Sequence, residues 1–246
     1  MDSNSLTTHL LSSTSEPTGS NAFKNATQTP FLHHAGLGTL PKSTLSKWLA
    51  QDRLYAQAYI RFASLLLANV PLPSRVDPNH VNEQLVDCLI GSIANVRREL
   101  KFFEDTASRY GLELEAEEVS EGVRRYRELF FGIGEGIERG ETGLLEGLVV
   151  LWGTEKCYLE AWIYAKSFGN SGVGQEDEDG GALRKEFIPN WTSGEFVAFV
   201  EQLGWFVDEL WKGEAGKERG VWKEVLTERW TELLDVERIF WPVLEE

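Results

Sequence analysis

The sequence predicts an all-α fold, and three observations support that prediction. Apolar residues recur at helical spacing through most of the chain after about residue 28. Prolines and polar residues interrupt this pattern where helices are expected to begin and end. No convincing strand and no internal repeat accompanies them. Because 42% of the 246 residues are apolar, with nine Trp and thirteen Phe, the chain can form a substantial core of one large domain or two small ones.

A few prolines and cap-forming residues predict where the helices begin. Pro41 suits the first turn of a long helix, and Asp77 followed by Pro78 has the pattern of a cap and a first helical position. Thr192 and Glu195 have the spacing of a capping box. Helices are therefore predicted over residues 41–69, 77–110, 119–133, 149–167, 192–211 and 221–244.

Two segments are expected to lie outside this helical domain. Residues 1–21 are rich in Ser and Thr with little periodicity, so we expect a mostly disordered tail. Residues 22–246 are then expected to form a single domain. Within it, the acidic, Gly-rich stretch GNSGVGQEDEDGGALRKE, residues 169–186, is predicted to be a solvated surface loop.

The charge of the chain indicates which partners to expect. The formal net charge is −15 and the isoelectric point is near 4.8, so phosphate backbones and anionic lipids would be repelled. We therefore expect no nucleic acid and no membrane partner, but a small molecule. Cys88 and Cys157 lie in apolar helical stretches, and no signal-peptide pattern or bilayer-length apolar run is present. A cytoplasmic protein is the expectation.

Three acids occupy positions where apolar residues would be expected. At 100° per residue, apolar side chains lie within about 40° of Glu155, of Asp52 and of Glu237, each at the centre of the apolar stripe of its own helix. A single buried acid is commonly satisfied by an Arg, a Tyr hydroxyl or a helix N-terminus. Three on separate helices predict instead a ligand pocket with acidic groups facing one internal space.

Four tyrosines accompany these acids. Tyr55 and Tyr59 follow Asp52 by one and two turns, Tyr126 lies on the inner face of its helix, and Tyr158 flanks Glu155. Aromatic faces and carboxylates together suit a flat heterocycle bearing amino groups, because rings stack and carboxylates accept N–H donors. Core packing with satisfied hydroxyls is the alternative for each tyrosine.

Histidine is too scarce to support a metal or haem cofactor. The four histidines are His9, His33, His34 and His80, and no Glu-x-x-His pair typical of carboxylate-bridged metal sites exists. The pair at 33 and 34 is expected to be structural, in a Gly-flanked turn. GIGEGIERG departs from the dinucleotide fingerprint, and GNSGVG is no nucleophile elbow. No cofactor is expected.

The motifs themselves resemble those of a known family. TPFLHHAGLGTLPKSTLSKWLAQDRLYAQAY is similar to the first motif of the TenA/THI-4 (thiaminase II) family, and LKFFEDTASRYGL, GVRRYRELF, WGTEKCYLEAW, NWTSGEFVAFVEQL and DVERIFW continue the resemblance over about residues 28–246. The resemblance implies a haem-oxygenase-like helical bundle without haem. It also implies a homo-oligomer, dimer or tetramer, acting on the pyrimidine half of thiamine or its breakdown products.

The resemblance also assigns roles to individual residues. It implies that Asp52 holds the aminopyrimidine, that Tyr55 and Tyr126 line the pocket, and that Glu237 is an acid/base group. Where the best-studied bacterial members carry a nucleophilic cysteine, this chain has Glu155 at the central position. Cys157 is turned about 200° away from it. The sequence is therefore similar to the glutamate-type branch, and covalent cleavage of thiamine itself is doubtful.

These assignments lead to a functional hypothesis with two alternatives. We expect a thiamine-salvage hydrolase that converts formylaminopyrimidine or aminopyrimidine to hydroxymethylpyrimidine, with Glu155 and Glu237 sharing the acid and base roles in an order that stays open. Asp52 would orient the ring while the tyrosines stack and donate. A non-catalytic binding protein for a thiamine-derived pyrimidine is the main alternative. A cofactorless oxidase is weakened by the scarcity of histidine.

Overall fold

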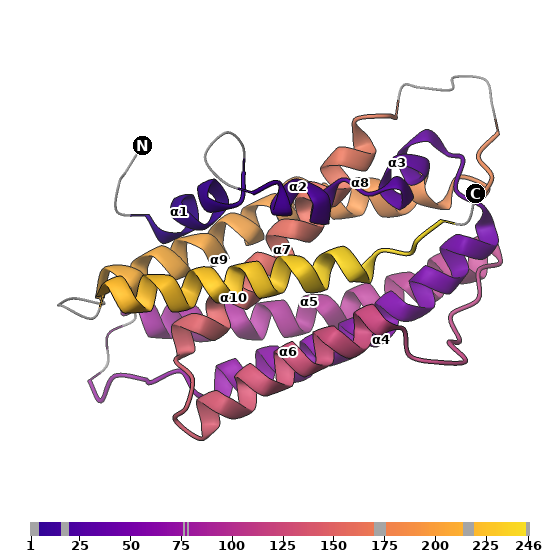
Figure 1. Cartoon of the computed structure of the whole chain (residues 1–246). Helices are drawn as coiled ribbons and strands as arrows, with labels where there is room; N and C mark the ends of the chain where they lie inside the picture. Colours follow the sequence, from indigo (N-terminus) through magenta and orange to yellow (C-terminus); the bar gives the residue numbers. More distant parts are fainter. Residues whose placement is uncertain are drawn as a thin grey trace.

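The computed structural model describes residues 5–15, 20–75, 77, 79–169, 176–213 and 219–244, and in these residues it is helical without a strand (Figure 1). The predicted all-α fold is confirmed. Its elements are α1 (Leu6–Ser13), α2 (Ala22–Thr27), α3 (Pro30–Leu37), α4 (Lys42–Ala68), α5 (Val81–Tyr110), α6 (Glu121–Glu138), α7 (Leu144–Lys166), the π-helix η1 (Leu183–Phe187), α8 (Ile188–Trp191), α9 (Gly194–Gly213) and α10 (Arg219–Phe240).

Helix α7 forms the centre of the bundle. It packs against α9, α10, α3, α2 and α6, and most of its residues are buried. A helix that is apolar around most of its circumference is buried on all sides, whereas a surface helix has one apolar face. Figure 1 shows α4, α5, α6, α9 and α10 as the other long helices of the bundle, and of these α4, α6, α9 and α10 contact α7. The polar side chains of α7 are therefore buried or half-buried, apart from Lys166 in its last turn, which is exposed.

Two glycines allow the close approach of neighbours to this central helix. A Cβ atom on Gly153 of α7 would lie 2.4 Å from Leu233 Cδ2 of α10. A Cβ atom on Gly36 of α3 would lie 2.1 Å from the carbonyl oxygen of Ala165 in α7. Both distances are too short for a side chain, so glycine at these positions lets α10 and α3 pack against α7.

The predicted cap of the second long helix is wrong. Helix α5 begins at Val81, and the ring of His80 accepts a hydrogen bond from Asn82 N at 3.2 Å as its cap. Asp77 instead accepts from Asn79 N at 3.1 Å, a local turn. Pro78 lies outside the described residues. Asp is favoured in such turns for the same reason that it is favoured at caps, since its side chain accepts from a backbone N–H two residues on.

The predicted capping box at Thr192 is also wrong by one position. Helix α9 begins at Gly194, and Ser193 Oγ accepts from Phe196 N at 3.2 Å. The Thr192 hydroxyl donates instead to the carbonyl oxygen of Ile188 at 2.7 Å, at the end of α8. The last helix ends at Phe240, four residues before the predicted boundary.

The expectation of a disordered N-terminal tail is wrong for residues 5–15. Helix α1 packs on α9 and α10, and Leu6 and Leu10 are fully buried. Asp208 of α9 accepts hydrogen bonds from Thr7 N at 3.0 Å and from Thr7 Oγ1 at 2.8 Å. The predicted tail also includes residues 1–4 and 16–19, which lie outside the described part of the chain.

The predicted solvated loop is wrong for residues 182–186, which are helical, whereas residues 176–181 form a turn in which Glu176, Glu178 and Gly180 are exposed. Asp179 is buried and accepts from Gly181 N at 2.8 Å and Leu183 N at 2.7 Å, so its carboxylate caps the start of η1. Arg184 forms a salt bridge with Asp177. Residues 170–175, the remainder of the loop after Gly169, lie outside the described residues. The acidic composition of this stretch gave no sign that one of its carboxylates, that of Asp179, is buried and caps a helix.

The two adjacent histidines are helical rather than part of a Gly-flanked turn. His33 and His34 lie in α3, where His34 Nδ1 is 2.8 Å from Thr39 Oγ1. Among the described residues, no group of three or more His, Cys, Asp and Glu side chains could hold a metal ion. The described helices also include none with the length and apolarity needed to cross a membrane.

Candidate active site

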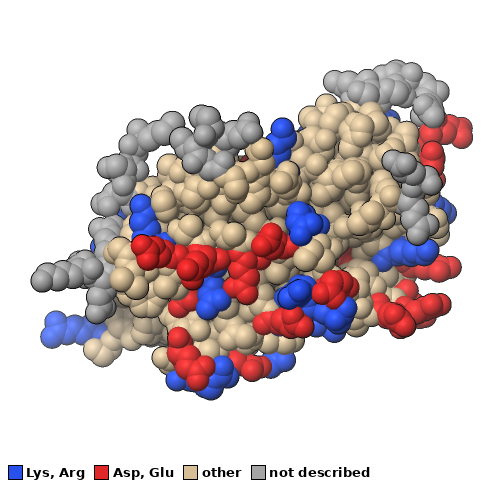
Figure 2. Space-filling view, viewed as in Figure 1, with Lys and Arg blue, Asp and Glu red and all other residues tan. Residues whose placement is uncertain are grey.

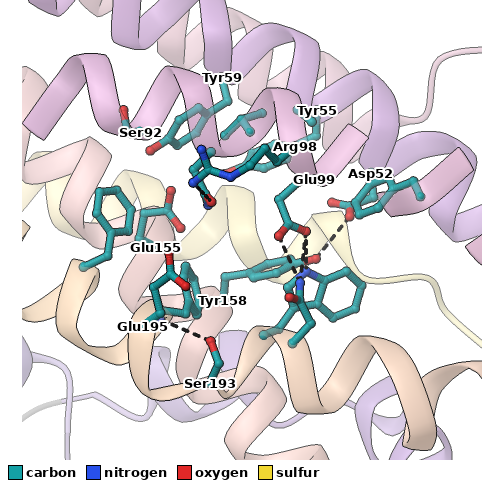
Figure 3. Close-up of a pocket in the computed structure, with 18 of the residues that line it drawn as sticks. Asp52, Tyr55, Tyr59, Ser92, Arg98, Glu99, Glu155, Tyr158, Ser193 and Glu195 are labelled. Atoms are coloured by element: carbon teal, nitrogen blue, oxygen red, sulfur yellow. Dashed lines mark hydrogen bonds between the residues drawn. The ribbon is translucent and has the colours of Figure 1, made fainter. Parts of the chain in front are cut away.

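A cavity of about 300 Å³ opens between α4, α5, α7, α8 and α9 (Figure 3). Five of the seven residues that the sequence singled out line it, and they are Asp52, Tyr55, Tyr59, Glu155 and Tyr158. The Tyr158 and Trp191 rings also line it and pack edge to face, with centroids 5.3 Å apart. Acidic groups and aromatic faces therefore share one space, as predicted.

Asp52 lies on α4 and is almost completely buried. Its Oδ2 accepts a hydrogen bond from the Tyr158 hydroxyl at 3.1 Å. Burial raises the pKa of Asp52 well above its ordinary value, and the nearby charges of Glu99, Glu237 and Glu155 raise the pKa further, against the opposing effect of Tyr158. Asp52 therefore offers a carboxyl group that retains a proton far more readily than an exposed one.

Glu155 is on the cavity side of α7, as its position in the apolar stripe predicted. Burial raises its pKa to about 7, the Tyr59 hydroxyl lowers it, and the charge of Glu99 raises it. None of the described Lys and Arg side chains forms a salt bridge with it. A carboxyl group with a pKa near neutrality can exchange protons with a bound substrate or water.

Glu99 of α5 is a cavity residue that the sequence interpretation missed. Its carboxylate accepts from Asn190 Nδ2 at 3.0 Å and from Trp191 Nε1 at 3.3 Å, which connects α5 to α8. Figure 3 shows Glu99 directed toward the same space as Asp52 and Glu155. A signal for it exists in the sequence, because Val96, Phe102 and Phe103 lie three or four residues from Glu99 on the same side of the helix.

Two further charged residues at the cavity were also missed. Arg98 and Glu195 line it from α5 and α9, and both are exposed. No apolar stripe surrounds an exposed residue, so the search for acids among apolar neighbours had no signal for them.

Glu237 and Tyr126 do not line the cavity, which corrects the prediction that the three acids face one space. Both are buried behind it, where the Tyr126 hydroxyl donates to Glu237 Oε2. The pKa of Glu237 is raised to about 8, chiefly by burial and in small part by the charge of Glu155, against the lowering effect of Tyr126 and Trp241. The helical angle of Glu237 correctly indicated an inward direction, but Tyr126 and Tyr55 separate it from the cavity.

Neither cysteine lines the cavity. Burial raises the pKa of Cys88 to about 11 and that of Cys157 well above its ordinary value, so both thiols are held neutral. On α7, Glu155 lines the cavity and Cys157 does not.

Replacing both cysteines by Ser is expected to leave most of the predicted hydrolytic activity intact. A neutral, buried thiol is a poor nucleophile, and neither cysteine lines the cavity. Turnover of the double variant, measured beside its melting temperature, checks this expectation. Near-complete loss of activity in a folded Cys157→Ser protein would support a thiol mechanism instead.

Two known proteins are similar to this chain over part of their own length. A protein of Fusarium pseudograminearum named a probable transcription factor is 28% identical over 235 residues, which cover 84% of this chain and 45% of that protein. A Glycine max protein named a probable bifunctional TENA-E protein is 20% identical over 148 residues, 60% of this chain and 60% of that protein. The chain thus spans about half the length of these two relatives.

Solved structures resemble the whole described fold. A TenA homologue from Pyrococcus furiosus has a TM-score of 0.73 at 23% identity, with 96% of this chain and 100% of that chain covered. A TenA family transcription regulator from a Silicibacter species has a TM-score of 0.73 at 17% identity, with 97% and 96% covered. These similarities confirm the predicted haem-oxygenase-like, TenA-like bundle. Residues 21–246 match the TENA/THI-4/PQQC family, so the chain belongs to the TENA/THI-4/PQQC family.

Proposed function

We propose that this protein is a thiamine-salvage hydrolase of the glutamate-type branch, which converts formylaminopyrimidine or aminopyrimidine to hydroxymethylpyrimidine. Membership of the family favours a function related to thiamine. One observation carries the finer proposal: Glu155, a carboxyl group whose pKa is about 7, opens on the same cavity as the buried Asp52. The cavity thus supplies a proton-exchanging group and an orienting group at once.

Asp52 is the group that would orient the ring. The edge of an aminopyrimidine presents an amino donor beside a ring nitrogen, and one carboxyl group can accept from the first and share its proton with the second. The raised pKa of Asp52 favours this arrangement, because burial makes the carboxyl group retain its proton more readily. Tyr158 fixes the carboxyl group through its hydrogen bond, and Tyr55 and Tyr59 supply aromatic surface for stacking.

Glu155 is the group that would act on the reacting atoms. In the hydrolysis of the aminomethyl substituent, water adds to the methylene carbon, the carbon–nitrogen bond breaks, and the nitrogen leaves as ammonia. The water loses one proton and the departing nitrogen gains one. Glu155 as a carboxylate can take the proton from water, since its pKa lies near the working pH. With the formylated substrate, water adds first to the formyl carbon and formate leaves.

The charge distribution agrees with a small substrate. On the face shown in Figure 2, acidic side chains form a row over α10 with Lys and Arg scattered among them. The absence of nucleic-acid and membrane partners stays a prediction, as do the cytoplasmic location and the homo-oligomer, a dimer or tetramer. Light scattering on the purified protein measures the last of these.

Incubation with each pyrimidine, followed by mass spectrometry, tests the proposed reaction. Loss of the formyl group or of ammonia, with gain of the hydroxyl, is expected of the wild type. A pyrimidine-dependent rise in melting temperature without turnover would favour the non-catalytic binding protein. If neither a mass change nor a thermal shift occurs with either pyrimidine, the proposal is wrong.

A further inference from the structure

A chain of hydroxyl groups joins the buried Glu237 to the cavity. Tyr55 lines the cavity, and its hydroxyl is 2.8 Å from Thr154 Oγ1. Thr154 Oγ1 donates to the Tyr126 hydroxyl at 3.2 Å, and the Tyr126 hydroxyl donates to Glu237 Oε2. Thr154, Tyr126 and Glu237 are all buried, so this chain has no exposed branch.

With Glu237 as a carboxylate, the directions of these hydrogen bonds follow from the number of protons on each hydroxyl. A threonine hydroxyl has one hydrogen, and that of Thr154 is donated to Tyr126. The contact between Tyr55 and Thr154 must therefore have Tyr55 as its donor. All three hydroxyl protons then point toward Glu237, and the Tyr55 oxygen accepts no hydrogen bond from the other members of the chain.

The surroundings of Glu237 are those of a titrating group rather than of a structural ion pair. Glu237 Oε1 is buried and forms no hydrogen bond to the residues that the structure describes. No described Lys or Arg forms a salt bridge with Glu237. The titratable groups that face it from α4, α6 and α7 are Asp52, Tyr55, Tyr126, Glu155 and Cys157.

We propose that Thr154 is a positioning residue that completes a proton relay from Glu237 through Tyr126 and Tyr55 to the cavity. This inference rests on the proposed hydrolysis, and it assigns the acid and base roles that the sequence left open. Glu155 takes the proton from water. Glu237 supplies the proton that the leaving nitrogen needs, although it does not touch the substrate.

Each transfer in the relay conserves the number of protons. Protonated Glu237 gives its proton to Tyr126, Tyr126 gives its own to Thr154, Thr154 gives its own to Tyr55, and Tyr55 gives its own to the departing nitrogen. Each hydroxyl loses one proton and gains one, and Glu237 ends as a carboxylate. The hydrogen bonds then all point toward Glu237, which is the arrangement in the structure. A proton passing back from the cavity in the opposite sense restores the starting state.

Thr154→Val and Thr154→Ser form a matched pair that tests the relay. Valine keeps the shape of threonine without its hydroxyl, whereas serine keeps the hydroxyl. We expect Thr154→Val to lower kcat by at least about tenfold with KM changed by less than about twofold, and Thr154→Ser to stay within about threefold of wild type. We also expect Thr154→Val to lose the limb of the pH–rate profile that Glu237→Gln removes. A wild-type kcat and profile in Thr154→Val, or an equal loss in both variants, would overturn the proposal.

A second measurement keeps the relay separate from the proposed reaction. If the wild type hydrolyses neither pyrimidine, the proposed function fails, and the relay is judged by carbon-13 NMR of labelled tyrosine rings. The Tyr55 signal, identified by its absence in Tyr55→Phe, is expected to shift with the ionisation of Glu237 in the wild type and in Thr154→Ser. This shift is expected to fall by at least about half in Thr154→Val, because the connecting hydroxyl is gone. An equal shift in all three proteins would refute the relay.

A second variant tests the relay if Thr154→Val does not fold. Tyr55→Phe breaks the relay at its cavity end and is expected to lower kcat by at least about tenfold and to lose the same pH limb. A wild-type kcat and profile in that variant would refute the relay.

Discussion

Asp52→Asn is expected to weaken the affinity for an aminopyrimidine by about 10- to 100-fold while the fold survives, the scale of one lost hydrogen bond to a charged group. Asparagine keeps the shape of the side chain, but its amide cannot transfer a proton to a ring nitrogen, so the pair of a carboxylate with a protonated ring cannot form. The fold should survive because Asp52 has a strongly raised pKa and forms no salt bridge with the described basic residues, so no buried cation loses its partner. Isothermal titration with hydroxymethylpyrimidine, which resists further hydrolysis, measures the affinity.

Asp105→Asn is the matched control for this measurement. Asp105 lies on α5, is exposed and pairs only with the exposed Lys101, so its replacement is expected to leave the affinity unchanged. An unchanged affinity in Asp52→Asn would make Asp52 a structural buried acid. A large loss of melting temperature in Asp52→Asn, with no similar loss in Asp105→Asn, would point the same way.

The sequence predicted the direction of the site residues better than their depth. The position of an acid within an apolar stripe placed Asp52 and Glu155 correctly, because the angle on a helix determines which side chains face inward. The helical angle of Glu237 correctly predicted that its side chain points inward. The further prediction that Glu237 lines the cavity was wrong. A helical angle says nothing about what lies between a side chain and the cavity, and here Tyr126 and Tyr55 do.

Local signals failed where several positions compete for one role. Thr192 and Ser193 are both good caps, and the helix begins after the second because Thr192 donates to the carbonyl oxygen of Ile188 in α8. Helix α1 is too short for its period to stand out, and it is held by tertiary contacts of Leu6 and Leu10. Neither the end of α8 nor the surface that covers α1 can be read from the nearby sequence.

Glu155→Gln is expected to lower the rate of hydrolysis by about two orders of magnitude or more, the scale of lost general acid or base catalysis. It is also expected to melt at or above the wild type at about pH 8. The pKa of Glu155 is about 7 in the folded protein and 4.5 by ordinary standards, so the folded state binds this proton more tightly. The free energy of unfolding that this group contributes is greatest below about pH 4.5 and falls as the pH rises to about 7. Glutamine has no proton to lose, so the variant escapes this fall.

Melting temperatures at about pH 5 and about pH 8 therefore separate a working acid from a structural one. The difference between Glu155→Gln and wild type should become more positive from the lower to the higher pH, while Glu195→Gln, at the exposed rim of the same cavity, should show the same difference at both. A buried ion pair would give the opposite result, since removing one charge leaves the other unpaired at a cost of about 3 kcal/mol. A much lower melting temperature, or turnover close to that of the wild type, would mean that Glu155 does not serve the reaction. A raised melting temperature together with lost turnover would mean that the fold tolerates a buried carboxyl group at the centre of α7 because the chemistry requires one there.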